Sequence, residues 1–423
     1  MMDIFISFKT AFSLLVDYWW LYLPILLFAL LITGYQDYTR EKYIASLGWV
    51  LLEITLPPDV VKSPKIAENI YSGLHGTYSK PLSWKKKFFE GKVPEWFSLE
   101  IVGNGGDIKF YIRCTETVRN LVEAQIFSQY PEAEIKIAED YVSLVPDEPN
   151  EEYDLFGTEL MFTKDDAFPI KTYPFFEEES GKDEFVRTDP LAPYLEVLSS
   201  LNAGEHIWLQ LIIRPTGGEW VAKAKAVVDK MTGKKPEVKE PFVGSVINAI
   251  DALISGGPSE AVKKEDKEFS LQKLTPRQKF TLEQVEMKIS KLGFKGGHRL
   301  IYIAKREAMN KARVPTVIGM FKQLYANDLN TFKPNGYTVT VADGYLAWLF
   351  PSNRGFGADQ QEYKRKVNII DAYKTREFVH HNNILNTEEL ATLWHLPGIG
   401  VKAPLLPRVE AVKGQPPAGL PTK

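Results

Sequence analysis

The chain has 423 residues, 44% of them hydrophobic and 25% charged, which is ordinary for a globular protein of about two or three domains. Its formal net charge of −3 excludes a generally basic nucleic-acid coat and leaves room only for local basic patches. The single cysteine, Cys114, excludes an intramolecular disulfide framework and a cysteine-based zinc site. It falls in a predicted strand, where we expect a buried side chain, and it fits a reducing compartment.

Residues 1–45 are predicted to form an N-terminal membrane anchor. The stretch 11–35 is strongly apolar, and a helix of this length exceeds the ~30 Å hydrocarbon core at ~1.5 Å per residue. No small-residue cleavage site is evident, which favours a retained single-pass helix over a signal peptide. Positive residues are more frequent after the span than before it, so the positive-inside rule places the bulk of the chain in the cytoplasm. The predicted anchor residues are Trp19, Trp20, Tyr22, Pro24 and Tyr35.

The fold class is predicted to be α+β, with two ferredoxin-like modules after the anchor. In the first module, residues 46–145, alternating apolar residues predict strands, and helical spacing predicts the helices between them. A turn at Asn104-Gly105-Gly106 joins the central strands into a hairpin, because glycine supplies positive φ. The resulting order is βαββαβ, with strands at 49–56, 98–102, 108–114 and 134–138 and helices after Ser63 and Thr117.

The same element order recurs in residues 146–350, which predict a second module. Its strands are expected at 159–163, 206–214, 299–305 and 337–341, with helices after Asp189-Pro190 and at 315–325. A helical insertion, 219–297, interrupts the hairpin. It contains an apolar segment, 242–254, that packs on the other insertion helices, lies on a membrane or binds a partner.

Residues 351–400 are predicted to be a C-terminal helical segment, and 401–423 a Pro/Gly-rich extended tail. A helix is expected at 361–373. Asn386 and Glu389 form a predicted capping box, in which each side chain accepts from the other residue's backbone N–H. The helix that follows ends before Pro397.

Two basic runs are candidate contacts for lipid or nucleic acid. Lysines neutralise phosphates and aromatic rings stack on bases, but a polybasic segment beside a membrane anchor also binds anionic lipid. A third possibility is that the aromatic residues of the first run, in a loop at 80–94, pack on the sheet. The candidate residues are Trp84, Lys85, Lys86, Lys87, Lys364, Arg365 and Lys366.

The sequence contains no recognisable catalytic motif. It lacks a Walker A loop, a nucleophile elbow, a zincin motif and the kinase signature set. The clustered histidines His380, His381 and His395 favour surface or interface positions over a metal site. We therefore expect no enzyme activity, no cofactor and no metal.

Several motifs carry a family resemblance. They are residues 49–53 (WVLLE), 62–64 (KSP), 122–125 (VEAQ) with 130–134 (YPEAE), and 385–397 (LNTEELATLWHLP). The chain resembles an uncharacterised family of membrane-anchored proteins from candidate-phyla (Patescibacteria-type) bacteria. In relatives this region precedes a conjugation-type ATPase domain of the HerA/FtsK class. The resemblance implies a type IV secretion-like or DNA-translocation machine at the cytoplasmic membrane, and ATP hydrolysis is not carried over to this chain.

The expected function is a membrane-anchored, non-catalytic adaptor that docks a separate HerA/FtsK-like motor ATPase, as a homo-oligomer matching the motor. Docking is assigned to the tail and to the residues Asn386, Glu389, Leu390, Leu393, Trp394 and Pro397. The alternative is a membrane-tethered nucleic-acid-binding module, with DNA as partner. An unrecognised enzyme would instead show a deep pocket with convergent titratable groups. A further expected contact surface is the strand face that carries Phe110, Tyr111 and Arg113.

Overall fold

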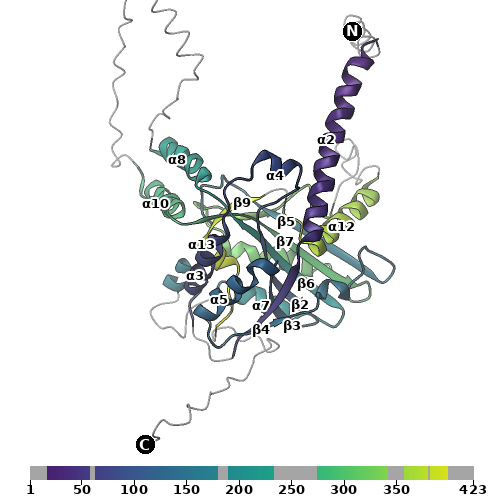
Figure 1. Cartoon of the computed structure of the whole chain (residues 1–423). Coiled ribbons are helices and arrows are strands. Elements are labelled where there is room, and N and C mark those ends of the chain that lie inside the picture. The colour runs from purple at the N-terminus through teal and green to yellow at the C-terminus, as the bar shows by residue number, and fades with distance from the viewer. Residues whose placement is uncertain are drawn as a thin grey trace, which may run out of the picture.

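The computed structural model describes residues 17–57, 62–179, 189–232, 274–341, 357–379 and 382–398. It is a mixed α+β protein, in which helices pack on an antiparallel sheet and one long apolar helix projects from the body (Figure 1). This agrees with the predicted class. The sheet, however, is continuous rather than divided between two modules.

The projecting helix is α2 (Trp19–Ser46). Its 28 residues correspond to ~42 Å, and none of them is buried. Residues 18–36 include no Asp, Glu, Lys or Arg. Length and composition therefore suffice to cross a membrane. The predicted anchor residues Trp19, Trp20, Tyr22 and Tyr35 are all exposed on this helix, and Pro24 lies within it.

The first half of the sheet contains the elements predicted for residues 46–145. Its strands run in the order β4-β1-β3-β2, and every neighbouring pair is antiparallel. Gly105 and Gly106 form the hairpin turn with φ of 56° and 95°. Cys114 is fully buried in β3, as expected. The elements are β1 (Trp49–Thr55), α3 (Lys65–Leu74), η1 (His75–Thr77), α4 (Trp84–Phe88), β2 (Phe97–Asn104), β3 (Asp107–Thr115), η2 (Glu116–Val118), α5 (Arg119–Gln129), β4 (Glu134–Ile137) and η3 (Tyr141–Leu144).

The second half runs in the order β6-β7-β5-β8, again with antiparallel neighbours. The elements are β5 (Tyr153–Phe162), α6 (Tyr173–Glu179), α7 (Ala192–Ser199), β6 (Glu205–Pro215), α8 (Glu219–Met231), α10 (Pro276–Ser290), β7 (Gly293–Lys305), α11 (Arg313–Gly319), η6 (Met320–Leu324) and β8 (Phe332–Pro334).

Strands β2 and β6 join the two halves. They pair antiparallel from Phe97↔Ile213 to Asn104↔His206, so neither strand is an edge. An unpaired edge would expose a row of backbone N–H and C=O groups, and β2 and β6 are buried along nearly their whole length. Pairing through this seam produces one nine-stranded sheet.

Two predicted boundaries of the second half differ in the structure. The closing strand is β8, not residues 337–341. The threonines of that predicted strand instead form hydrogen bonds along the edge of β5 that is not paired with β7. Thr338 accepts from the Glu159 backbone N–H at 3.0 Å, and Thr340 accepts from the Gly157 backbone N–H at 3.2 Å. The predicted insertion 219–297 contains α8 and α10, but β7 already begins at Gly293. The apolar segment 242–254 lies outside the described residues.

Both faces of the sheet are covered. One core contains inward side chains such as Leu52 and Phe110, together with residues of α3, α5 and α7. The opposite core contains Tyr111 and Trp208, covered by α12 (Ala358–Thr375). The expected contact surface on β3 is therefore wrong, because Phe110 and Tyr111 are only 4% and 3% exposed.

The C-terminal segment belongs to the body. Strand β9 (Asn383–Asn386) pairs with the first residues of β7, and α13 (Thr387–Leu393) packs on α3. The predicted capping box is present: Asn386 Oδ1 accepts from the Glu389 N–H at 2.8 Å, and Glu389 Oε2 accepts from the Asn386 N–H at 2.9 Å. Helix α12 confirms the helix expected at 361–373.

Candidate functional site

Helix α4 lies against the C-terminal part of α2. The Phe88 ring is 5.5 Å from the Tyr35 ring, and the Thr39 hydroxyl donates to the Phe88 carbonyl at 3.5 Å. Gly91 makes the closest approach: it has φ of +63°, and a Cβ there would lie 2.1 Å from the Thr39 carbonyl oxygen. Only glycine fits this position, so the loop after α4 is fitted to α2.

The aromatic side chains around α4 are directed outward. Trp84 and Phe89 are 66% and 56% exposed, and both contact Phe88. Lys85, Lys86 and Lys87 complete the helix. The proposal that these aromatics pack on the sheet is therefore wrong. They lie instead beside the helix that can cross a membrane, on the side of the body from which that helix projects (Figure 1).

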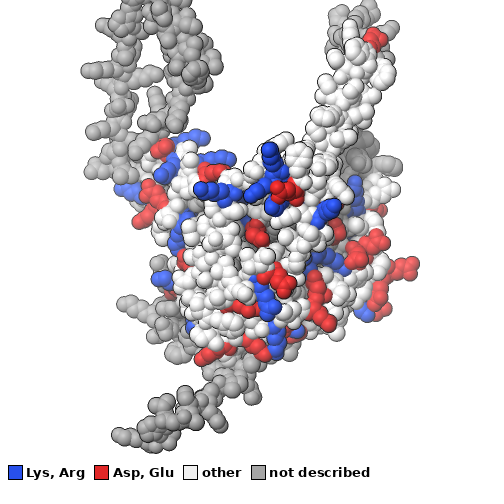
Figure 2. Space-filling view, in the orientation of Figure 1, with Lys and Arg blue, Asp and Glu red and all other residues white. Residues whose placement is uncertain are grey.

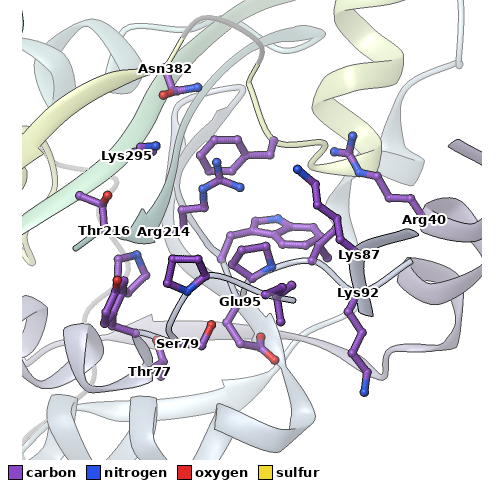
Figure 3. Close-up of a pocket in the computed structure, with 18 of the residues that line it drawn as sticks. Arg40, Thr77, Ser79, Lys87, Lys92, Glu95, Arg214, Thr216, Lys295 and Asn382 are labelled. Atoms are coloured by element: carbon purple, nitrogen blue, oxygen red, sulfur yellow. The ribbon is translucent and has the colours of Figure 1, made fainter. Parts of the chain in front are cut away.

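A cavity of about 640 Å³ opens beneath α4. It lies between the C-terminal part of α2, which we call its foot, the segment around α4, the end of β6 and the start of β7 (Figure 3). We call it the α4 cavity. Its basic side chains are Arg40, Lys87, Lys92, Arg214 and Lys295, and its acidic side chains are Asp37, Glu95 and Glu219.

Four of these cations have no carboxylate partner within the described part of the chain. Lys92 pairs with Glu90 at 2.7 Å, whereas no ion pair joins the remaining four to a described residue: Arg40, Lys87, Arg214 and Lys295. Burial raises the pKa of Glu95, which favours its neutral form. Burial lowers the pKa of Arg214, and the positive charge of Arg40 lowers it further. The Arg214 guanidinium lies over the Phe378 ring at 4.2 Å.

The buried charges elsewhere are paired. Arg376 is fully buried and contacts Glu100 at 3.0 Å and Asp140 at 2.5 Å. Lys288 contacts Glu389 at 3.0 Å, and both side chains are inaccessible to solvent. A third buried pair joins Arg299 Nε to Glu159 at 3.0 Å. These contacts bridge distant segments of the chain and belong to the core.

His395 and Asp189 form another buried contact, at 3.0 Å. Histidines 380 and 381 lie outside the described residues. Among the residues that are described, no group of three or more His, Cys, Asp or Glu side chains could hold a metal ion.

The predicted docking residues are inside the protein. Asn386, Glu389, Leu390, Leu393 and Trp394 are at most 4% exposed, and Pro397 is buried as well. The Trp394 carbonyl accepts from the Tyr71 hydroxyl at 2.6 Å, and Glu389 also accepts from the Ile170 N–H at 3.0 Å. The docking prediction is wrong for these side chains because the segment fills the core between α3 and the sheet.

Two of the three basic side chains of the run on α12 have partners within the body. Arg365 donates to the carbonyls of Gly336 and Val339 at 3.0 and 2.9 Å, while Lys366 contacts Asp154 at 2.7 Å. These bonds attach α12 to the edge of β5. Lys364 alone of the three is exposed, and none of the three lines the α4 cavity.

Sequence reasoning identified Lys87 but missed Arg40, Arg214 and Lys295. Arg40 follows Tyr35, the last predicted anchor residue, by five positions, which is a weak local signal for a lipid headgroup contact. Arg214 and Lys295 are separated by the whole insertion and meet only through the β6–β7 register. No local pattern could have paired them.

The fold and this site define a mixed α+β body that carries an exposed apolar helix and a cation-lined cavity at its foot. The chain belongs to the family of the domain of unknown function DUF8128, whose family model matches residues 48–404. The match covers the whole described body and begins after α2. No curated protein matches the chain.

Proposed function

We propose that this protein is a membrane-anchored, non-catalytic scaffold that holds its α+β body at the cytoplasmic face of the membrane. The observation that carries the proposal is α2: a helix of 28 residues with no buried residue, apolar up to residue 36 and continuous with the body. Leaving this surface in water is unfavourable, whereas a bilayer would cover it. The fit of α4 against Tyr35 and Thr39 supports the same orientation, because it brings basic and aromatic side chains to the expected headgroup level.

We further propose that each half of the sheet is a ferredoxin-like unit. The strand orders β4-β1-β3-β2 and β6-β7-β5-β8 support this. When the four strands of each half are numbered in chain order, the first half has the order 4-1-3-2 and the second has the order 2-3-1-4. The second order is the first read in the opposite direction. The two units would be joined by their second strands, β2 and β6. In such a scaffold helices cover both faces of the sheet.

The partner proposed from the resemblance is a HerA/FtsK-class motor ATPase in a type IV secretion-like or DNA-translocation machine. Because the segment 386–397 is buried, docking is assigned to residues 401–423, which lie outside the described residues. The scaffold would then match the motor in its oligomeric state.

The test is co-purification from native membranes of the full chain and of a chain that ends at residue 400. We expect the full chain to retain the motor ATPase, identified by mass spectrometry, and the shortened chain to lose it while remaining folded. The matched control is Lys136→Gln, an exposed lysine on β4, which should retain the motor. Equal recovery of the motor by the full and shortened chains would remove the docking assignment.

A second candidate, a membrane-tethered nucleic-acid-binding module, is favoured by one observation. Exposed Trp84 beside Lys85 and Lys86 combines a stacking surface with cations. This function predicts DNA affinity that falls steeply with salt and is lost when both lysines are changed to glutamate. DNA binding that is unaffected by those changes would exclude this helix as the contact.

A further inference from the structure

Strands β6 and β7 place two positive residues directly opposite each other. In the antiparallel register Arg214 pairs with Lys295, and both side chains line the α4 cavity. Like charges at directly opposed positions are destabilising. Neither residue forms an ion pair with a described carboxylate, including the acidic side chains Asp37, Glu95 and Glu219 that line the same cavity.

Two more cations approach the same space from outside the sheet. Arg40 comes from α2 and Lys87 from α4, and Figure 3 shows the nitrogen ends of Arg40, Lys87 and Arg214 directed into the cavity. Lys92 points away from them in this view. Figure 2 shows Lys and Arg side chains gathered at the surface beside the foot of α2. Four positive groups from four separate elements therefore converge on one volume.

The height of the cavity along α2 limits what could fill it. The charge-free stretch ends at residue 36, and Arg40 follows it by four residues, or ~6 Å along a helix. The polar headgroup layer on each side of a bilayer is roughly 5–8 Å thick. The cavity thus lies where the headgroups of the adjacent leaflet would be, and its ~640 Å³ accommodates one headgroup.

We propose that the α4 cavity binds the phosphate group of an anionic phospholipid headgroup. Arginine suits this ligand, because its planar guanidinium donates two parallel hydrogen bonds to phosphate oxygens. Contact with the Phe378 ring, 4.2 Å from the guanidinium carbon, positions Arg214, whose N–H groups form no ion pair with a described carboxylate. The inference rests on the proposed membrane anchoring but not on the docking of a motor.

The experiment is isothermal titration calorimetry on the full chain in neutral detergent. The probes are dihexanoyl phosphatidylglycerol, zwitterionic dihexanoyl phosphatidylcholine and sodium phosphate. We expect saturable binding of phosphatidylglycerol, and weaker binding of the other two. The double variant Arg214→Gln/Lys295→Gln should bind phosphatidylglycerol about tenfold more weakly or worse, because each hydrogen bond between charged groups contributes on that order.

The matched control is Lys136→Gln/Lys333→Gln, which removes the same net charge from exposed positions on the edge strands β4 and β8. This variant should bind like the unmodified chain. If the cavity variant does not fold, as judged by circular dichroism, Arg40→Gln/Lys87→Gln removes two cations that lie outside the sheet. Undiminished binding in a folded cavity variant, or an equal loss in the control, would overturn the proposal. Binding of sodium phosphate without phosphatidylglycerol would overturn the lipid as the source of the phosphate.

Discussion

Arg376 and Arg214 are two arginines of one body with opposite surroundings. Arg376 has two carboxylate partners, Glu100 and Asp140, and no solvent contact. Arg214 faces Lys295 and Arg40 and has no carboxylate partner in the described chain. Charges that build the fold are neutralised within it, whereas four cations of the α4 cavity form no ion pair with a described residue.

The comparison also separates two segments that looked alike as candidate surfaces. The motif at 385–397 combines polar and apolar residues, and its polar groups are satisfied by Lys288 and by backbone N–H groups inside the core. The basic run at α4 has exposed rings and lysines at the foot of α2. The first segment stabilises the protein and the second is available for contact.

Removal of Arg376 should have the largest effect on stability. Arg376→Met leaves Glu100 buried without a cation, and breaking a buried pair in this way costs about 3–5 kcal/mol. Urea unfolding of the detergent-solubilised chain measures the loss. The double variant Glu100→Gln/Arg376→Met should recover part of it, since no buried charge then remains unpaired. A loss below about 1 kcal/mol for the single variant would show that the network is not structural.

Asp189 should make stability depend on pH. Burial acts to raise the pKa of this carboxyl, but the His395 ring and the Leu191 N–H hold it below the ordinary value. The ionised form therefore favours the folded state. Its contribution is complete above the unfolded pKa of ~3.9 and disappears as pH falls through the lowered folded value.

The corresponding variant is Asp189→Asn. It should lose about 1.5–3 kcal/mol at neutral pH, as expected for a hydrogen bond to a charged group, and a smaller amount near pH 3. Unfolding free energies measured at both pH values test this. An equal loss at both would mean that the charge of Asp189 does not contribute.

The capping box should give a smaller loss. Asn386→Ala removes the acceptor for the Glu389 N–H and should cost about 1 kcal/mol, a typical value for an N-cap. The same variant, when folded, should bind a partner as the unmodified chain does, because Asn386 is only 3% exposed. Weaker partner binding without a loss of stability would return this segment to the docking surface.

The cavity cations should matter least for folding. Lys87→Gln is expected to change the unfolding free energy by no more than about 0.5 kcal/mol in either direction, because it removes an exposed lysine that forms no ion pair with a described residue. Thermal unfolding in neutral detergent checks this. A large destabilisation would mean that Lys87 stabilises the folded state, as Arg376 does, and would contradict the distinction between the two kinds of cation.

The sequence predicted most local elements because their causes are local. Alternation marked the strands, Asn104-Gly105-Gly106 marked the hairpin, and Asn386 with Glu389 marked a helix start that the structure contains. The β2–β6 seam could not be predicted, since it depends on which edges pair. The like-charge pair Arg214 and Lys295 exists only through the β6–β7 register. The burial of the 385–397 motif was also hidden, because Lys288, the partner of Glu389, lies on a distant helix.

The anchoring of the chain by α2 is the central claim and can be measured directly. Membranes that contain the full chain are washed with alkaline carbonate, and the mass of the chain in the pellet is determined. The account predicts that the chain stays in the pellet with residues 19–46 intact, and that protease digests the body in inside-out vesicles but not in intact spheroplasts. Release of the chain by carbonate, or a mature form that lacks α2, would contradict it.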